Sequence, residues 1–435
     1  MFGTIDQFIR EAATWLWGFP MLILLSGVGV YLSLRLKGLQ FRYFLKAARL
    51  AYRYRTGEGE GNISPMQSLF AALGGIIGNG NLGGVATAIA IGGPGAVFWF
   101  WIASLVAMIL VYVETYLAVF QREKGPDGTF SGGPMYYIEK LLGLRWLAVT
   151  FALAMGLKTL LATSTIQSNS VALAFQSVFD SPLLPVCVVL SILTWLVTIG
   201  GLKSIAKTLE KLTPIMVLLY LTAGFAILLF NWRILPEVLN LIVSSAFTHR
   251  GAAGGFAGAT VLMALRYGVA RGFYSNEAGT GSSPIMYSTA KTDDPEKLAL
   301  IGMFGVVIDT VVGTLTAFVI LATGTWMSGE TSTALTTAAF GTFLGDYGGY
   351  FVFLTSFLFG YSTLVAWCFY GEQCFAFIWG PRVRKLYRWM FCVAIMFGFL
   401  EAELLWSWGD LLNGITVAVN IFAVTLLVRF SRQFR

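Results

Sequence analysis

Long apolar runs recur along the whole 435-residue chain, with short polar stretches between them. A helix needs about 20 apolar residues to cross the hydrocarbon core of a bilayer. On that scale the pattern predicts about eleven transmembrane helices. The predicted spans are residues 17–35, 65–91, 95–121, 146–178, 183–201, 212–230, 256–287, 297–323, 349–379, 389–407 and 410–429. We therefore expect an all-α polytopic membrane protein whose surroundings are a lipid bilayer.

Two of these runs are interrupted near their middles by glycine and asparagine. The first reads Gly74-Gly-Ile-Ile-Gly-Asn-Gly-Asn-Leu-Gly-Gly84, and the second reads Gly272-Phe-Tyr-Ser-Asn-Glu-Ala-Gly-Thr-Gly-Ser-Ser-Pro284. Unpaired backbone groups are costly in lipid, so a helix breaks there only where protein, an ion or a ligand satisfies them. A matched pair of broken helices indicates a binding site of a secondary transporter.

Lysine and arginine gather on alternate loops, which predicts the orientation of the chain. The loop after the first span is the most basic one, with Arg35, Lys37, Arg42, Lys46, Arg49, Arg53 and Arg55. Cytoplasmic loops of membrane proteins carry such an excess. We expect a multi-pass protein of the cell (inner) membrane, with its N-terminus outside and its C-terminus cytoplasmic.

The predicted spans divide into one extra N-terminal helix and two halves. Residues 1–64 form that helix and a basic cytoplasmic loop, and 65–230 form a first repeat of about five helices. Residues 231–255 form an outer surface segment, and 256–435 form the second repeat. Each repeat opens with a broken helix. An odd number of spans per repeat places the halves in opposite orientations, which is a 5+5 inverted repeat.

Composition excludes several classes of function. The chain is 57% hydrophobic and 12% charged, whereas a soluble domain carries roughly 25% charge. The net charge of +7 sits on loops between spans and does not indicate nucleic acid. The four cysteines have no metal-ligand or disulfide spacing. No nucleophile set or phosphate-binding loop is visible, so we expect neither an enzyme nor a cofactor.

Several charged residues fall inside predicted spans, where they are rare and usually functional. Glu277 lies at the second break, where three roles stay open: binding a substrate amine or cation, carrying a proton, or pairing with Arg271. Asp309 either supports a broken helix or relays a proton. Glu114 and Lys158 lie on consecutive spans, so a structural salt bridge between them is expected.

The amino-acid sequences of the two breaks resemble those of a known family. Gly78-Asn-Gly-Asn-Leu-Gly-Gly-Val-Ala-Thr-Ala-Ile89, Gly92-Gly-Pro-Gly-Ala-Val-Phe-Trp99 and Ala270-Arg-Gly-Phe-Tyr-Ser-Asn-Glu-Ala-Gly-Thr-Gly-Ser-Ser-Pro284 resemble the signatures of the alanine-or-glycine:cation symporters. This sodium:alanine symporter family belongs to the amino-acid–polyamine–organocation superfamily, which has the leucine-transporter-type fold. The likeness covers residues 15–430.

The resemblance implies a secondary active transporter that imports a small neutral amino acid, alanine or glycine, by symport with Na+. Alternating access would occur around a midplane site. H+ in place of Na+ is one alternative. An ion channel is the alternative from another class, although no repeated selectivity motif is present. We expect the amino acid and sodium as binding partners, and no other metal.

The resemblance also implies site residues. The substrate site would contain Asn79, Gly80, Asn81, Gln167, Phe273, Ser275, Asn276 and Trp367. The ion site would combine the hydroxyls of Ser362 and Thr363 with carbonyls near Ala72 and Gly75, because oxygen ligands suit a hard cation. Those hydroxyls favour sodium, while Glu277 and Asp309 keep the proton alternative open. Asn79 stands where the family usually has threonine, which leaves the identity of the substrate open. The sequence does not fix the enantiomer of the substrate.

Overall fold

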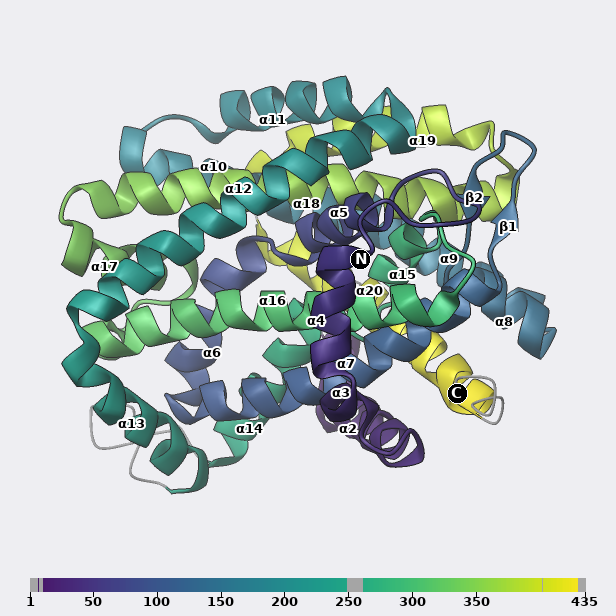
Figure 1. The fold of residues 1–435 in the computed structure, drawn as a ribbon. Helices are drawn as coiled ribbons and strands as arrows, with labels where there is room; N and C mark the ends of the chain where they lie inside the picture. The colour runs from purple at the N-terminus through teal and green to yellow at the C-terminus, as the bar shows by residue number, and fades with distance from the viewer. Residues whose placement is uncertain (1–6, 8–10, 249–260, 401, 429–435) are drawn as a thin grey trace.

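The computed structural model describes residue 7 and residues 11–248, 261–400 and 402–428, and its fold is built almost entirely of helices (Figure 1). Seven helices in this part of the chain are long and apolar enough to cross a membrane. They are Glu11–Arg35, Gly95–Phe120, Arg145–Phe179, Gly201–Phe230, Pro295–Thr323, Tyr347–Trp379 and Ser407–Leu427. A bent helix pair at residues 65–92 is an eighth candidate. The chain is thus an all-helical membrane protein with a broken span.

The N-terminal part of the chain contains the helices α2 to α12 and a short two-stranded hairpin. Their bounds are α2 Phe19–Arg35, α3 Leu39–Arg42, α4 Phe44–Arg53, α5 Pro65–Ile76, α6 Val85–Gly92, α7 Gly95–Phe120, β1 Glu123–Lys124, β2 Phe130–Ser131, α8 Pro134–Leu142, α9 Arg145–Leu157, α10 Ser164–Phe179, α11 Leu183–Thr198 and α12 Gly201–Phe230. A π-helical segment, Lys158–Thr163, joins α9 to α10.

The C-terminal part of the chain contains the helices α13 to α20. Its bounds are α13 Leu235–Phe247, α14 Val261–Ser275, α15 Ser282–Tyr287, α16 Pro295–Thr323, α17 Ser332–Leu344, α18 Tyr347–Trp379, α19 Val383–Met396 and α20 Ala402–Leu427. The predicted span 256–287 starts in residues outside the described ones, so only its part from Val261 onward is described.

The first break has a defined start and end. Ser64 caps α5 by accepting a hydrogen bond from the backbone N–H of Gln67, whose side chain in turn bonds to the backbone N–H of Ser64. The helix stops at Ile76, and a π-helical turn over Gly80–Gly84 leads into α6. The two helical pieces are bent by 51°. The sequence prediction of a break here is confirmed.

The second break separates α14 from α15. Residues 276–281 form a turn in which Glu277, Gly279 and Gly281 have positive φ values of 52°, 83° and 74°. Only glycine adopts this left-handed conformation without strain, and Glu277 holds it as a non-glycine residue. Residues in such conformations cluster at functional sites.

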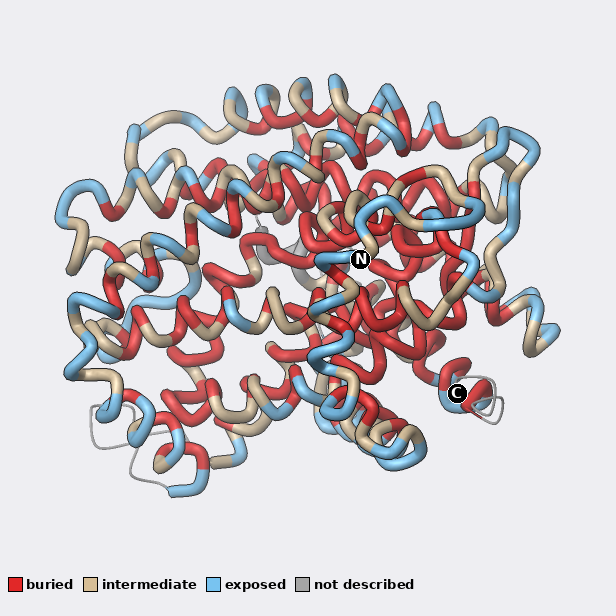
Figure 2. Tube along the Cα trace, viewed as in Figure 1, coloured by how far each residue is buried: buried red, intermediate tan, exposed pale blue. Residues whose placement is uncertain are grey.

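The interior is centred on α7, which packs against α14 and α16. Figure 2 shows buried positions along the inner helices and exposed positions on the outward faces of the outer ones. Many outward positions are apolar: the side chains of Phe230 and Leu34 are 88% and 75% exposed. An apolar outer surface suits contact with lipid rather than water.

The structure corrects several predicted boundaries. The sequence predicts one span over 389–407, but α19 ends at Met396 and α20 begins at Ala402. Side chains of α10 explain the interruption, since Ser168 donates to the carbonyl of Ile395 and Asn169 donates to that of Gly398. These donors replace helical hydrogen bonds where the helix ends. The span predicted at 183–201 is a helix of only 16 residues, and α12 begins at Gly201 rather than at residue 212.

The loop after α7 also differs from the all-α prediction. Strands β1 and β2 form a short antiparallel hairpin, in which Glu123 pairs with Ser131 and Lys124 with Phe130. Its turn contains Gly125-Pro-Asp-Gly128, and these residue types favour a tight turn.

Candidate functional site

A cavity of about 840 Å³ lies where the two breaks meet. Its wall contains Asn79, Gly80 and Asn81 of the first break and Ser275 and Glu277 of the second. The other predicted site residues on this wall are Gly75, Gln167, Arg271, Thr363 and Trp367. The cavity therefore joins segments from both halves of the sequence.

Asp309 of α16 connects the two breaks. Its Oδ1 accepts a hydrogen bond of 2.6 Å from Asn81 Nδ2, and its Oδ2 accepts one of 2.8 Å from Ser275 Oγ. The side chain is completely buried. Hydrogen bonds to a carboxylate are among the stronger ones, so this one carboxyl group holds both unwound segments in a fixed relation.

Arg271 of α14 is directed at the first break. Its Nη2 donates a hydrogen bond to the carbonyl of Gly80. A Cβ added at Gly84 would lie only 1.5 Å from the guanidinium, so glycine is required for this close approach. The predicted pairing of Arg271 with Glu277 is not formed in the described part of the chain; Glu277 accepts a hydrogen bond from Ser282 Oγ instead.

Asn79 belongs to a chain of polar side chains that joins the first break to α10 and α18. Its Nδ2 donates to Gln167 Oε1 of α10 at 3.1 Å, and its Oδ1 accepts from Ser356 Oγ of α18 at 2.8 Å. A Cβ at Gly360 would come within 2.8 Å of the Asn79 amide nitrogen. The side chain is held on both sides, which fixes the shape of this part of the wall.

The residues predicted for a cation lie together at the end of α5. Thr363 Oγ1 lies within hydrogen-bond distance of two carbonyl oxygens, that of Phe359 at 2.8 Å and that of Gly74 at 3.2 Å. Trp367 Nε1 donates to the carbonyl of Gly75 at 3.1 Å. Ser362 is buried beside them and donates to the carbonyl of Phe359 at 2.9 Å. Ala72 and Ser362 do not line the cavity. The carbonyl of Gly74 is a further oxygen at this position that the sequence did not single out.

Two predicted substrate residues lie away from the cavity. Asn276 donates to Ser104 Oγ at 3.0 Å and to the carbonyl of Gly272 at 2.8 Å, so its amide faces α7. Phe273 is 1% exposed and belongs to the hydrophobic core. Both residues hold the second break against the protein interior rather than facing the cavity.

Lys158 lines the cavity, whereas the sequence predicts that it pairs with Glu114. The expected salt bridge with Glu114 is wrong: Lys158 Nζ donates to Asn413 Oδ1 at 2.8 Å and lies 4.1 Å from the centre of the Trp367 ring. Asp410 and Asn413 of α20 line the cavity with it. Their spacing of three places them on one helical face, a signal that was present in the sequence.

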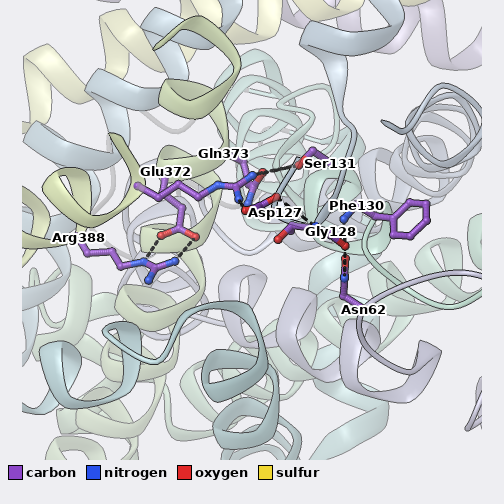
Figure 3. Close-up of polar contacts among 10 residues, drawn as sticks. Asn62, Asp127, Gly128, Phe130, Ser131, Glu372, Gln373 and Arg388 are labelled. Atoms are coloured by element: carbon purple, nitrogen blue, oxygen red, sulfur yellow. Dashed lines mark hydrogen bonds and ion pairs between the residues drawn. The ribbon is translucent and has the colours of Figure 1, made fainter. Parts of the chain in front are cut away.

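Polar contacts join the β1–β2 hairpin to α18 and α19, as Figure 3 shows. Asp127 of the hairpin pairs with Arg384 of α19, and Ser131 Oγ donates to Gln373 Oε1 of α18 at 2.9 Å. Glu372 and Arg388 form a second ion pair between α18 and α19.

The hairpin is also tied to the loop before α5. Asn62 Nδ2 donates to the carbonyl of Gly128 at 2.9 Å, and its Oδ1 accepts from the backbone N–H of Phe130 at 2.6 Å.

The cavity extends away from the hairpin. Its wall includes Thr14, Arg266 and Ser332. Ser332 is the first residue of α17, and Figure 1 shows α17 and α13 at the end of the molecule opposite the β1–β2 hairpin. The cavity therefore reaches from the two breaks toward the end of the molecule that carries α17.

A helical membrane protein with a cavity between two broken helices is typical of secondary transporters. The comparisons with known proteins name the group. The model of the sodium:alanine symporter family matches residues 2–434, and the chain belongs to that family. This confirms the resemblance seen in the sequence, and with it a transporter rather than an enzyme.

Similar proteins cover nearly the whole chain. The sodium/alanine symporter AgcS of Methanococcus maripaludis is 38% identical over 96% of this chain and 94% of its own length. The probable sodium/glutamine symporter GlnT of Bacillus subtilis is 37% identical over 97% and 88%. The crystal structure of MhsT in complex with L-phenylalanine has a TM-score of 0.60 at 15% identity, covering 85% of this chain and 90% of that one. It shares the leucine-transporter-type fold.

Proposed function

We propose that the protein imports a small neutral amino acid, alanine or glycine, together with sodium. The observation that carries this proposal is the contact of Asp309 with both breaks, Asn81 on one side and Ser275 on the other. An amino acid has two opposite charges. The backbone amides that open α6, with Arg271 nearby, suit its carboxylate. The oxygens of Ser275 and Glu277 suit its ammonium group.

Sodium would bind where α5 ends against α18. The hydroxyls of Ser362 and Thr363 and the carbonyls of Ala72, Gly74 and Gly75 supply oxygen, the ligand type that a hard cation requires. Binding there would stabilise the end of α5, and through the break it would favour the conformation that binds substrate. Coupling of this kind amounts to about 1–3 kcal/mol in typical allosteric proteins.

The proposed architecture is the one expected from the sequence. About eleven spans would form one extra helix and a 5+5 inverted repeat, with the repeats at 65–230 and 256–435 and an outer segment at 231–255. Support comes from the equivalent positions of the two breaks, α5–α6 and α14–α15. With the basic loops in the cytoplasm and the N-terminus outside, the cavity would face outward, and rocking of the halves would open it inward.

Uptake into proteoliposomes tests the proposal. Labelled alanine, glycine and serine are supplied under an imposed sodium gradient, then under a proton gradient of equal size, and then with no gradient. Uptake that needs sodium supports the proposal. Uptake driven by the proton gradient alone would contradict sodium as the coupling ion. Currents far above carrier rates would favour a channel.

A further inference from the structure

A buried carboxyl group outside the cavity wall stands without a charged partner. Glu114 lies in α7 and is completely buried. Its Oε1 accepts a hydrogen bond of 2.5 Å from Asn420 Nδ2, while its Oε2 has no hydrogen-bond partner. No lysine or arginine of the described residues forms an ion pair with it.

The contact on Oε1 connects this carboxyl group to the second break. The same Asn420 Nδ2 donates to the carbonyl of Gly279 at 2.9 Å, and the Oδ1 of Asn420 accepts from the hydroxyl of Tyr137. Gly279 lies in the turn between α14 and α15. One amide of α20 therefore joins α7, α8 and the backbone of the second break.

The groups around Glu114 carry no compensating charge. Asn420 from α20 is neutral, α8 presents the phenol of Tyr137, and the second break presents backbone. The carboxyl group of that break, Glu277, is engaged by Ser282 and lines the cavity. Burying an unpaired carboxylate is energetically costly, whereas burying the neutral acid avoids most of that cost.

We propose that Glu114 is a proton-binding site, occupied in this conformation, whose neutral acid lets α20 clamp the second break. Proton release would leave an uncompensated charge, and the charge would be relieved only when α7 and the second break separate from α20 and water enters. By linkage, protonation and the clamped arrangement stabilise each other. This adds a proton-sensitive step to the sodium-driven cycle and does not depend on which amino acid is carried.

Infrared difference spectroscopy tests the site without any transport. The spectrum of Glu114→Gln is subtracted from that of the wild-type protein in lipid nanodiscs at neutral pH. Loss of one carboxylic-acid C=O band in the variant is expected. Loss of carboxylate bands instead would overturn the proposal, because it would show that Glu114 is ionised. Glu58→Gln, at an exposed position, is the matched control and should leave the acid band unchanged.

A second variant keeps the test valid if Glu114→Gln does not fold. Tyr137→Phe removes only the hydroxyl that bonds to Asn420, so the amide is free to reorient and the hydrogen bond to Glu114 changes. The acid C=O band should then shift in frequency. An unchanged band would contradict the link through Asn420. Since neither readout involves substrate, failure here is distinct from failure of the proposed symport.

Discussion

Asn81 of the first break and Asp309 of α16 are joined by a hydrogen bond of 2.6 Å between the amide nitrogen and the carboxyl oxygen. The other oxygen of Asp309 holds Ser275 of the second break. A single buried side chain therefore links the two breaks. If sodium binds at the proposed site near the first break, this connection would give it a physical route to the proposed substrate site at the second.

Replacing Asp309 should separate the two breaks. Asp309→Asn keeps the shape but loses the charge and one acceptor. Hydrogen bonds to charged groups contribute about 1.5–3 kcal/mol each, so alanine uptake should fall by at least tenfold. Initial rates in proteoliposomes measure this. Asp346→Asn, at an exposed position before α18, is the control. Equal uptake by Asp309→Asn and wild type would show that the bridge is dispensable.

Asn79→Thr tests selectivity. Threonine is too short to contact Gln167 and Ser356 together, so the amide chain along the wall is lost. A net hydrogen bond is worth about 1 kcal/mol. We expect alanine uptake to persist and the preference for alanine over glutamine to rise about fivefold. Competition of unlabelled glutamine against labelled alanine provides the measurement. An unaltered competition curve would remove Asn79 from the determinants of selectivity.

Gly84→Ala should disrupt the first break, because the added methyl group would occupy the position of the Arg271 guanidinium. We expect uptake to be lost while the protein remains in the membrane. Gly27→Ala in α2 is the matched control, since a Cβ there meets no atom within 4 Å and alanine favours a helix over glycine by about 1 kcal/mol. Normal uptake by Gly84→Ala would mean that Arg271 does not need this close contact.

The ion pair between Glu372 and Arg388 should matter for stability. Glu372 is 1% exposed and Arg388 is 14% exposed. Removing one partner of a buried pair typically costs 3–5 kcal/mol, so Glu372→Ala should lower the Tm of the purified protein by several degrees. Glu330→Ala, at an exposed position, should leave the Tm unchanged. The same Tm for both variants would argue that the pair contributes nothing measurable.

The sequence was sufficient to locate the breaks, because glycine and asparagine inside an apolar run leave few alternatives to an unwound helix. It could not determine which side chains face the cavity. The helical period is lost at a break, so neighbours such as Ser275 and Asn276 turn to different sides. The sequence leaves two roles open for Asp309, and its hydrogen bonds to both breaks fit the role of supporting a broken helix.

The sequence also could not predict the hydrogen-bond partners of the buried charged residues. Glu114 and Lys158 lie on consecutive predicted spans, but each bonds to an asparagine of α20, at positions 420 and 413. That helix is far from both residues in the sequence. The spacing of Asp410 and Asn413 indicates a polar face on α20. Their contact with the π-helical segment depends on tertiary packing, which the spacing does not predict.

The most direct test of sodium-coupled amino acid import measures the ion itself. Entry of radioactive sodium into proteoliposomes is followed with and without external alanine or glycine, for the wild type and for Asp309→Asn. The account predicts that the amino acid stimulates sodium entry in the wild type and that the variant loses this stimulation. Sodium entry that is the same with and without amino acid in the wild type would contradict it.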